Sequence, residues 1–127
     1  MTDSIGKLYN AVVAARGSDP GTSRTARLLR AGRAKMAKKL AEEAVEVVID
    51  AMHGQPEAVV RESADLLYNL VVLWVHSGVH PDEVWAEMRR REQMFGIAEK
   101  VPKDLVRSSP PRRKVMALEA RRIRKRR

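Results

Sequence analysis

The sequence predicts an all-α protein, a bundle of four to five helices based on a helical hairpin and completed by dimerisation. Apolar residues recur three and four positions apart through most of the chain up to Phe95, as on one face of a helix. Glycine and proline interrupt this pattern at the positions where helices commonly end and begin. The valine-rich segment VEVVI lies inside a longer pattern of period 3.6, so it indicates a helix rather than a strand.

The first two predicted helices are marked by polar capping residues. Asp3 can cap a helix that runs to about Arg16, because a carboxylate accepts hydrogen bonds from the first free backbone amides. Thr22 or Ser23 can begin a second, shorter helix, and Gly32 ends it.

Two long helices follow and form the predicted hairpin. The first spans residues 33–53 and is closed by Gly54. Pro56 at a first helical position opens the second, over residues 57–77, and Gly78 ends it. The connection of two or three residues around Gly54 requires the two helices to be antiparallel.

The rest of the chain divides into a last helix and an extension. Pro81 and the acids after it suit the first turn of a helix that reaches Met94 and Phe95. Prolines and serines then mark a linker, and residues 115–123 could give a short terminal helix. We therefore predict an all-α domain over residues 1–100 and a basic extension over residues 101–127.

Composition excludes several classes of protein. Of the 127 residues, 44% are hydrophobic and 32% charged, which suits a soluble globular domain, and no apolar run approaches the roughly 18 residues of a membrane span. The first twenty residues have no uninterrupted apolar segment of the kind found in secretory signals, so we expect a cytoplasmic protein. Without cysteine, disulfides and thiolate chemistry are excluded.

The net charge of +9 belongs to the C-terminal extension. Basic and acidic residues balance up to Val106, whereas residues 107–127 hold ten basic residues and one acid. Such a tail could make nonspecific, salt-sensitive contacts with nucleic acid, but it has no aromatic residue for base stacking. A solvated tail explains the same charge.

Acidic residues form a stripe on each arm of the predicted hairpin. On a helix, residues three and four apart share a face, so Glu43 and Glu46 lie together, as do Glu62 and Asp65. In an antiparallel hairpin two residues are level when their numbers average to that of the turn. Both Glu46 with Glu62 and Glu43 with Asp65 average to Gly54, which predicts that the four acids meet.

Four clustered carboxylates require a cation if they are more than solvated surface charges. The surface interpretation predicts basic partners three or four residues away, but Glu62 has none. A hard divalent ion with oxygen ligands fits the cluster, and Mg²⁺ does so in particular because it keeps waters and takes substrate phosphates. Zinc fits less well, since the chain has no cysteine and its three histidines lie outside the acidic stripes.

The two acidic segments, EEAVE at residues 42–46 and ESAD at residues 62–65, resemble the EExxE and ExxD motifs of the all-α nucleoside triphosphate pyrophosphohydrolases, the MazG-like superfamily. The longer segments KKLAEEAVEVVIDA, ESADLLYNLVVLW and VWAEMRRR are similar to the phosphoribosyl-ATP pyrophosphohydrolase family within it. This resemblance implies Mg²⁺-dependent hydrolysis of phosphoribosyl-ATP to phosphoribosyl-AMP and pyrophosphate in histidine biosynthesis, by a homodimer.

The resemblance also implies roles for individual residues. Glu42 would be catalytic, orienting the attacking water, or a further metal ligand. The implied metal ligands are Glu43, Glu46, Glu62 and Asp65, and the implied substrate-binding residues are Lys38, Lys39, Asn69, Arg90 and Arg91. Lys38 is equally explained by an ion pair with Glu42, four residues away.

Three positions depart from the family pattern. Arg24 stands where the family usually has an aromatic residue, and Asn69 and Glu92 stand where it usually has histidines. These departures leave the nucleotide open. The alternatives are a relative that hydrolyses another nucleoside triphosphate, or a non-enzymatic helical module whose basic tail binds nucleic acid.

Dimerisation is expected on physical grounds as well. The predicted hairpin has apolar residues on more than one side, including those of VVIDAM and LVVLW. Two other helices cannot cover all of this surface, so a second copy of the chain is expected to do so.

Overall fold

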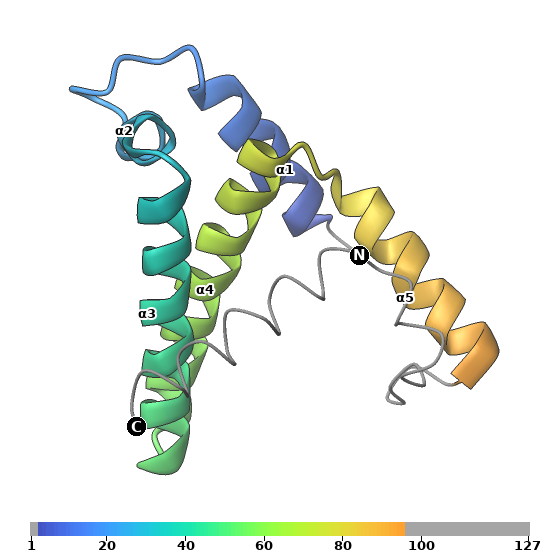
Figure 1. Cartoon of the computed structure of the whole chain (residues 1–127). Helices are drawn as coiled ribbons and strands as arrows, with labels where there is room; N and C mark the ends of the chain where they lie inside the picture. The colour runs from blue at the N-terminus through green and yellow to red at the C-terminus, as the bar shows by residue number, and fades with distance from the viewer. Residues whose placement is uncertain (1–2, 96–127) are drawn as a thin grey trace, which may run out of the picture. The chain divides into compact units, whose positions relative to one another are not determined.

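A computed structural model describes residues 3–95, and the predicted all-α class is confirmed there (Figure 1). All the regular structure in this range is helical. The five helices are α1 (Ser4–Ala15), α2 (Arg24–Ala31), α3 (Arg33–Met52), α4 (Pro56–Ser77) and α5 (Pro81–Phe95). The short terminal helix predicted at residues 115–123 lies outside the described residues.

The first two helices begin at the predicted capping residues. The Asp3 carboxylate accepts a hydrogen bond from the backbone N–H of Gly6 at 2.9 Å. The Ser23 hydroxyl accepts one from the backbone N–H of Ala26 at 3.1 Å. Each bond satisfies an amide that the helix itself leaves without an acceptor, and so fixes where the helix starts.

Helices α3 and α4 form the predicted antiparallel hairpin and lie side by side along their length (Figure 1). The connection takes only His53, Gly54 and Gln55. Gly54 has φ of +67°, a left-handed conformation that costs glycine little, and Pro56 follows as the first helical residue of α4. This short turn sets the register of the two helices.

The core lies where α1, α2 and the start of α3 pack against the C-terminal half of α4. Its fully buried members are Val12, Met36, Val71, Val72 and Val75. No other helix of the described residues covers the opposite half of the hairpin, toward Gly54, and Met52 and Val60 are 79% and 69% exposed there. The covered end holds the hairpin in place, while the other end presents apolar surface.

The chain divides into two units after Val84, within α5. The start of α5 is capped by the segment before it, because His80 Nδ1 accepts a hydrogen bond from the backbone N–H of Asp82 at 3.0 Å. In return, the Glu83 carboxylate accepts one from the backbone N–H of His80 at 3.0 Å. Among residues 3–95, no helix combines the length and apolar character needed to cross a membrane.

Candidate metal centre

Three carboxylates meet midway along the α3–α4 hairpin. Glu43 comes from α3, and Glu62 and Asp65 come from α4; one oxygen of each lies within 4.8 Å of the others. The level pairing of Glu43 with Asp65 about Gly54 explains why the two arms bring their acids together. Carboxylates separated by so short a distance repel unless a proton or a cation lies between them.

The effect of this crowding is visible in the pKa of Glu62, which rises from 4.5 to about 7. The largest cause is a hydrogen bond with the Glu43 side chain, which requires a proton between the two carboxyl groups. Partial burial and the charges of Glu46, Glu43 and Asp65 raise the pKa further. Either a shared proton or a cation therefore relieves the repulsion within the cluster.

Glu46 stands next to this cluster. The structure brings three of the four predicted acids within one ion's reach, and Glu46, one turn along α3 from Glu43, is exposed and outside the group of three. Its charge still acts on Glu62, whose pKa it helps to raise. Side-chain rotation is enough to change the distance of an exposed glutamate from the cluster.

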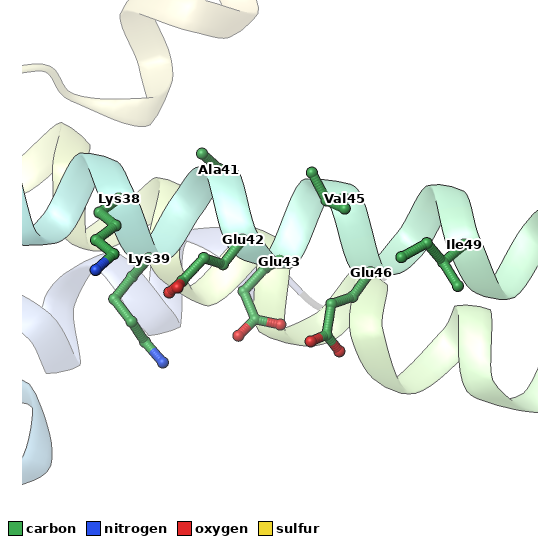
Figure 2. Close-up of a pocket in the computed structure, with 8 residues that line it drawn as sticks. All are labelled: Lys38, Lys39, Ala41, Glu42, Glu43, Val45, Glu46 and Ile49. Carbon is green, nitrogen blue, oxygen red and sulfur yellow. The ribbon is translucent and has the colours of Figure 1, made fainter.

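An open hollow of about 520 Å³ runs along the exposed side of α3 next to the cluster (Figure 2). Among residues 3–94, the residues that line it come from α3: Lys38, Lys39, Ala41, Glu42, Glu43, Val45, Glu46 and Ile49. Figure 2 shows Lys39, Glu42, Glu43 and Glu46 projecting from one side of the helix, with Ala41 and Val45 directed away from them. One side of α3 thus presents two amines and three carboxylates in a row.

Asn69 lies one turn beyond Asp65 on α4, but it is buried, at 1% exposure. Its amide Nδ2 donates to the backbone carbonyl of Asp65 at 2.8 Å. Its Oδ1 has no hydrogen-bond partner among residues 3–95. The side chain therefore fixes the helical turn that carries Asp65 and has almost no surface to offer a substrate.

Arg90 and Arg91, on α5 in the second unit, are both bound to Glu87 of the same helix. Arg90 donates to the Glu87 carboxylate from Nε at 2.9 Å and from Nη2 at 2.6 Å, and Arg91 donates from Nε at 2.9 Å. The hydrogen bonds from Arg90 and then Arg91 lower the pKa of Glu87 to about 2. Glu87 is not among the predicted site residues, although its spacing of three and four residues from the arginines indicates this contact.

Together, the helical hairpin and its acidic centre define a class of protein: an all-α protein with a carboxylate site suited to a divalent metal ion. Three oxygen donors with excess negative charge, from two rigid helices, suit a hard cation and give no soft ligand that would favour zinc.

Comparison with known proteins then gives the family. The profile of the phosphoribosyl-ATP pyrophosphohydrolase family matches residues 6–92, which is more than half of the chain. The chain belongs to this family. The resemblance inferred from the two acidic motifs is thereby confirmed.

Curated relatives agree with this assignment. The chain is 63% identical to phosphoribosyl-ATP pyrophosphatase 2 of Rhodopseudomonas palustris over the full length of both proteins. It is 62% identical to the protein of that name from Bradyrhizobium diazoefficiens, over 99% of each chain. Phosphoribosyl-ATP pyrophosphatase of Gluconobacter oxydans is 51% identical over 74% of this chain and 71% of its own length.

Proposed function

We propose that this protein hydrolyses phosphoribosyl-ATP to phosphoribosyl-AMP and pyrophosphate, a step of histidine biosynthesis, and that it requires Mg²⁺. The observation that carries the proposal is the meeting of Glu43, Glu62 and Asp65 within 4.8 Å on the two arms of one hairpin. Family membership supplies the reaction, and the names of the full-length relatives supply the substrate.

Glu43, Glu62 and Asp65 would hold the metal ion, and Glu46, one turn along α3 from Glu43, would be a fourth ligand. When bound, the ion would supply positive charge where negative charge develops on the pyrophosphate leaving group. The role of the chain's own residues is to fix the position of these oxygens, because both helices are held in register by the turn at Gly54.

Glu42 orients the water that attacks the phosphoanhydride bond, and accepts its proton. The carboxylate projects from the same side of α3 as Glu43 and Glu46 (Figure 2), and a water between it and a bound phosphoryl group can be held in line. Placing the water on an exposed side chain leaves the cluster carboxylates free to hold the ion.

The basic residues bind the substrate's phosphates. Lys38 and Lys39 lie one turn before the acids on α3 and line the same hollow. Arg90 and Arg91 exchange Glu87 for phosphate oxygens, which offer the same bidentate geometry. Asn69 contributes through Asp65, because it is buried and holds the Asp65 backbone carbonyl.

The active protein is a cytoplasmic homodimer in which residues 1–100 form the catalytic domain. The hairpin exposes a group of apolar side chains: Val48 at 60%, Met52 at 79% and Val60 at 69%. Several such side chains together indicate an interface, whereas a single one would not. In the part of the chain that the structure describes, the hollow beside the cluster has walls from α3 alone, so a second copy can supply a further wall. The basic extension predicted at residues 101–127 lies outside the described residues.

The decisive experiment measures pyrophosphate release in the presence of Mg²⁺ from phosphoribosyl-ATP and from a panel of nucleoside triphosphates. The wild type and Glu46→Gln are compared. We expect preference for phosphoribosyl-ATP and its loss in the variant. Activity on other triphosphates alone would reassign the substrate, and activity on none would contradict the proposal.

A further inference from the structure

Arg24, at the start of α2, lies against the ring of Tyr68 on α4. The guanidinium carbon is 5.2 Å from the centre of the ring, a distance at which the positive group is attracted to the electron-rich ring face. Tyr68 is half-buried and packs against the core, so its ring is a fixed surface rather than a mobile one.

The backbone that carries Arg24 is fixed as well. The hydroxyls of Thr25 and Tyr68 share a hydrogen bond of 2.7 Å, which ties the first turn of α2 to α4. On the other side of Arg24, Ser23 caps the helix through the amide of Ala26. The backbone of Arg24 is thus held between two anchored neighbours, and little backbone entropy remains to be lost when the residue binds a ligand.

Within the described part of the chain, the donors of Arg24 are not taken by any acid. Among residues 3–94, no carboxylate lies within ion-pair distance of it, whereas Arg90 and Arg91 are bound to Glu87. The ring covers one face of the guanidinium and leaves its N–H edge open. A planar cation with a supported face and an open edge is suited to a phosphate group, which accepts two parallel hydrogen bonds.

Tyr68 also places this arginine near the acidic cluster. It follows Asp65 by three residues on α4, which corresponds to a rise of about 4.5 Å and a rotation of about 60° around the helix. Both lie within the first unit of the chain, and Asp65 belongs to the group of three carboxylates. The ring that supports Arg24 therefore belongs to a residue less than one helical turn from a carboxylate of the cluster.

We propose that Arg24, supported by the Tyr68 ring, binds a phosphoryl group of the nucleotide substrate and helps to determine which nucleotide is accepted. This inference rests on the proposed pyrophosphohydrolase function. The phosphoryl group belongs either to the leaving pyrophosphate or to the nucleoside monophosphate product, and the two sources are separable by experiment.

The first test is steady-state kinetics of Arg24→Gln and Arg24→Lys with phosphoribosyl-ATP. We expect Arg24→Gln to raise KM about tenfold or more with a smaller change in kcat, since a charge-assisted hydrogen bond to the substrate is lost. Arg24→Lys keeps the charge and should recover part of the loss. Arg30→Gln removes the same charge from the other end of α2 and should leave KM unchanged.

The second test uses the supporting ring. Tyr68→Leu should raise KM in the same direction as Arg24→Gln, and combining the two substitutions should add little, because both act on one contact. Tyr68→Phe keeps the ring and removes only the bond to Thr25, so it should have the smaller effect. Fully additive effects of Tyr68→Leu and Arg24→Gln would overturn the shared contact.

The third test identifies the phosphoryl group and separates the two proposals. Calorimetric binding of pyrophosphate, AMP and ATP, each with Mg²⁺, is measured for wild type and Arg24→Gln. Weaker pyrophosphate binding assigns Arg24 to the leaving group, and weaker AMP binding assigns it to the nucleotide side. Unchanged affinity for all three ligands overturns the inference, whether or not phosphoribosyl-ATP is hydrolysed. If the wild type binds ATP through Arg24 but does not hydrolyse phosphoribosyl-ATP, only the proposed reaction is overturned.

Discussion

Glu62 is the residue at which the proposed function is least favourable for folding, because a metal site needs carboxylates close together and close carboxylates repel. The fold places it beside Glu43 and Asp65, and without a cation it is relieved by a proton shared with Glu43. A metal ion and this proton therefore compete for the same oxygens. Metal binding must release the proton, so it should be favoured as pH rises.

We expect the metal-free protein to lose stability as pH rises, and Glu62 to be the cause. Its pKa is about 7 in the folded state and 4.5 when unperturbed, so the folded state binds more protons between these values. The contribution is greatest below about pH 4.5 and is lost as pH rises through 7. The check is Tm from pH 5 to 8 in a chelator, for wild type and Glu62→Gln.

The variant cannot ionise at this position, so its Tm should fall less steeply over the same range. Saturating Mg²⁺ should flatten the wild-type slope as well, because the ion replaces the proton. Equal slopes for wild type and Glu62→Gln would show that the proton resides elsewhere.

Asp65→Asn should reduce kcat/KM by at least about 100-fold, since it removes a charged ligand while keeping the shape of the side chain. The matched control is Asp50→Asn. Asp50 follows Glu46 by four residues on α3, but it lies outside the group of three carboxylates. Its loss should therefore change activity little. Pyrophosphate release measured at several Mg²⁺ concentrations should also show that Asp65→Asn binds the metal more weakly, because it needs a higher Mg²⁺ concentration for half-maximal activity. Equal losses in both variants would contradict the assignment.

At the scale of the helix, α2 depends on local contacts for its position. It has only eight residues, too few to be stable alone, and is held by the Ser23 cap and by the bond between Thr25 and Tyr68. Because Arg24 lies between these contacts, the start of α2 determines where its guanidinium is presented.

Removing the cap should therefore be measurable as a loss of stability. Ser23→Ala leaves the Ala26 amide without its acceptor and should cost about 1 kcal/mol in the free energy of unfolding. Urea denaturation measures this. Ser18→Ala, in the exposed turn before α2, has no capping bond to lose and should change the free energy by much less. A Ser23→Ala protein as stable as wild type would mean that α4 alone holds α2.

The helix boundaries could be predicted because their signals are local. Asp3 and Ser23 cap the helices they were expected to cap, and Gly54 and Pro56 bound the hairpin turn as predicted. The meeting of Glu43 with Asp65 also followed from sequence, because a short turn converts helical spacing into level pairs.

Contacts between helices could not be predicted from local sequence signals. The polar type and spacing of Asn69 placed it on the acidic face, yet the packing of α1, α2 and α3 against α4 buries it. The contact of Arg24 with Tyr68 joins residues far apart in the chain, and helical periodicity carries no information about such a pair. Side-chain contacts between helices depend on the angles at which the helices cross, and these angles cannot be read from a single sequence.

At the scale of the whole molecule, the uncovered end of the hairpin predicts self-association. Sedimentation at micromolar concentration should show a dimer for wild type, because exposed Val48, Met52 and Val60 provide an apolar face that a second copy can bury. Met52→Glu, at a side chain 79% exposed, should shift the equilibrium to monomer without unfolding the chain.

Ala14→Glu provides the control, since it adds the same charge at an exposed position of α1, away from the hairpin. It should leave the dimer intact. A wild type that sediments as a monomer would remove the dimer from the proposal, and a Met52→Glu dimer would move the interface to another surface.

The three cluster carboxylates come from one continuous hairpin, and this has a consequence for how the protein acquires its site. Closing a turn of three residues is entropically cheap and fast, so these contacts have low contact order. The ion-binding centre can assemble early, before α1 and α2 dock. Arg24 joins it only when α2 reaches Tyr68. If folding is monitored by metal binding, the signal should therefore report formation of the hairpin. If it is monitored by nucleotide binding, the signal should report completion of the whole fold.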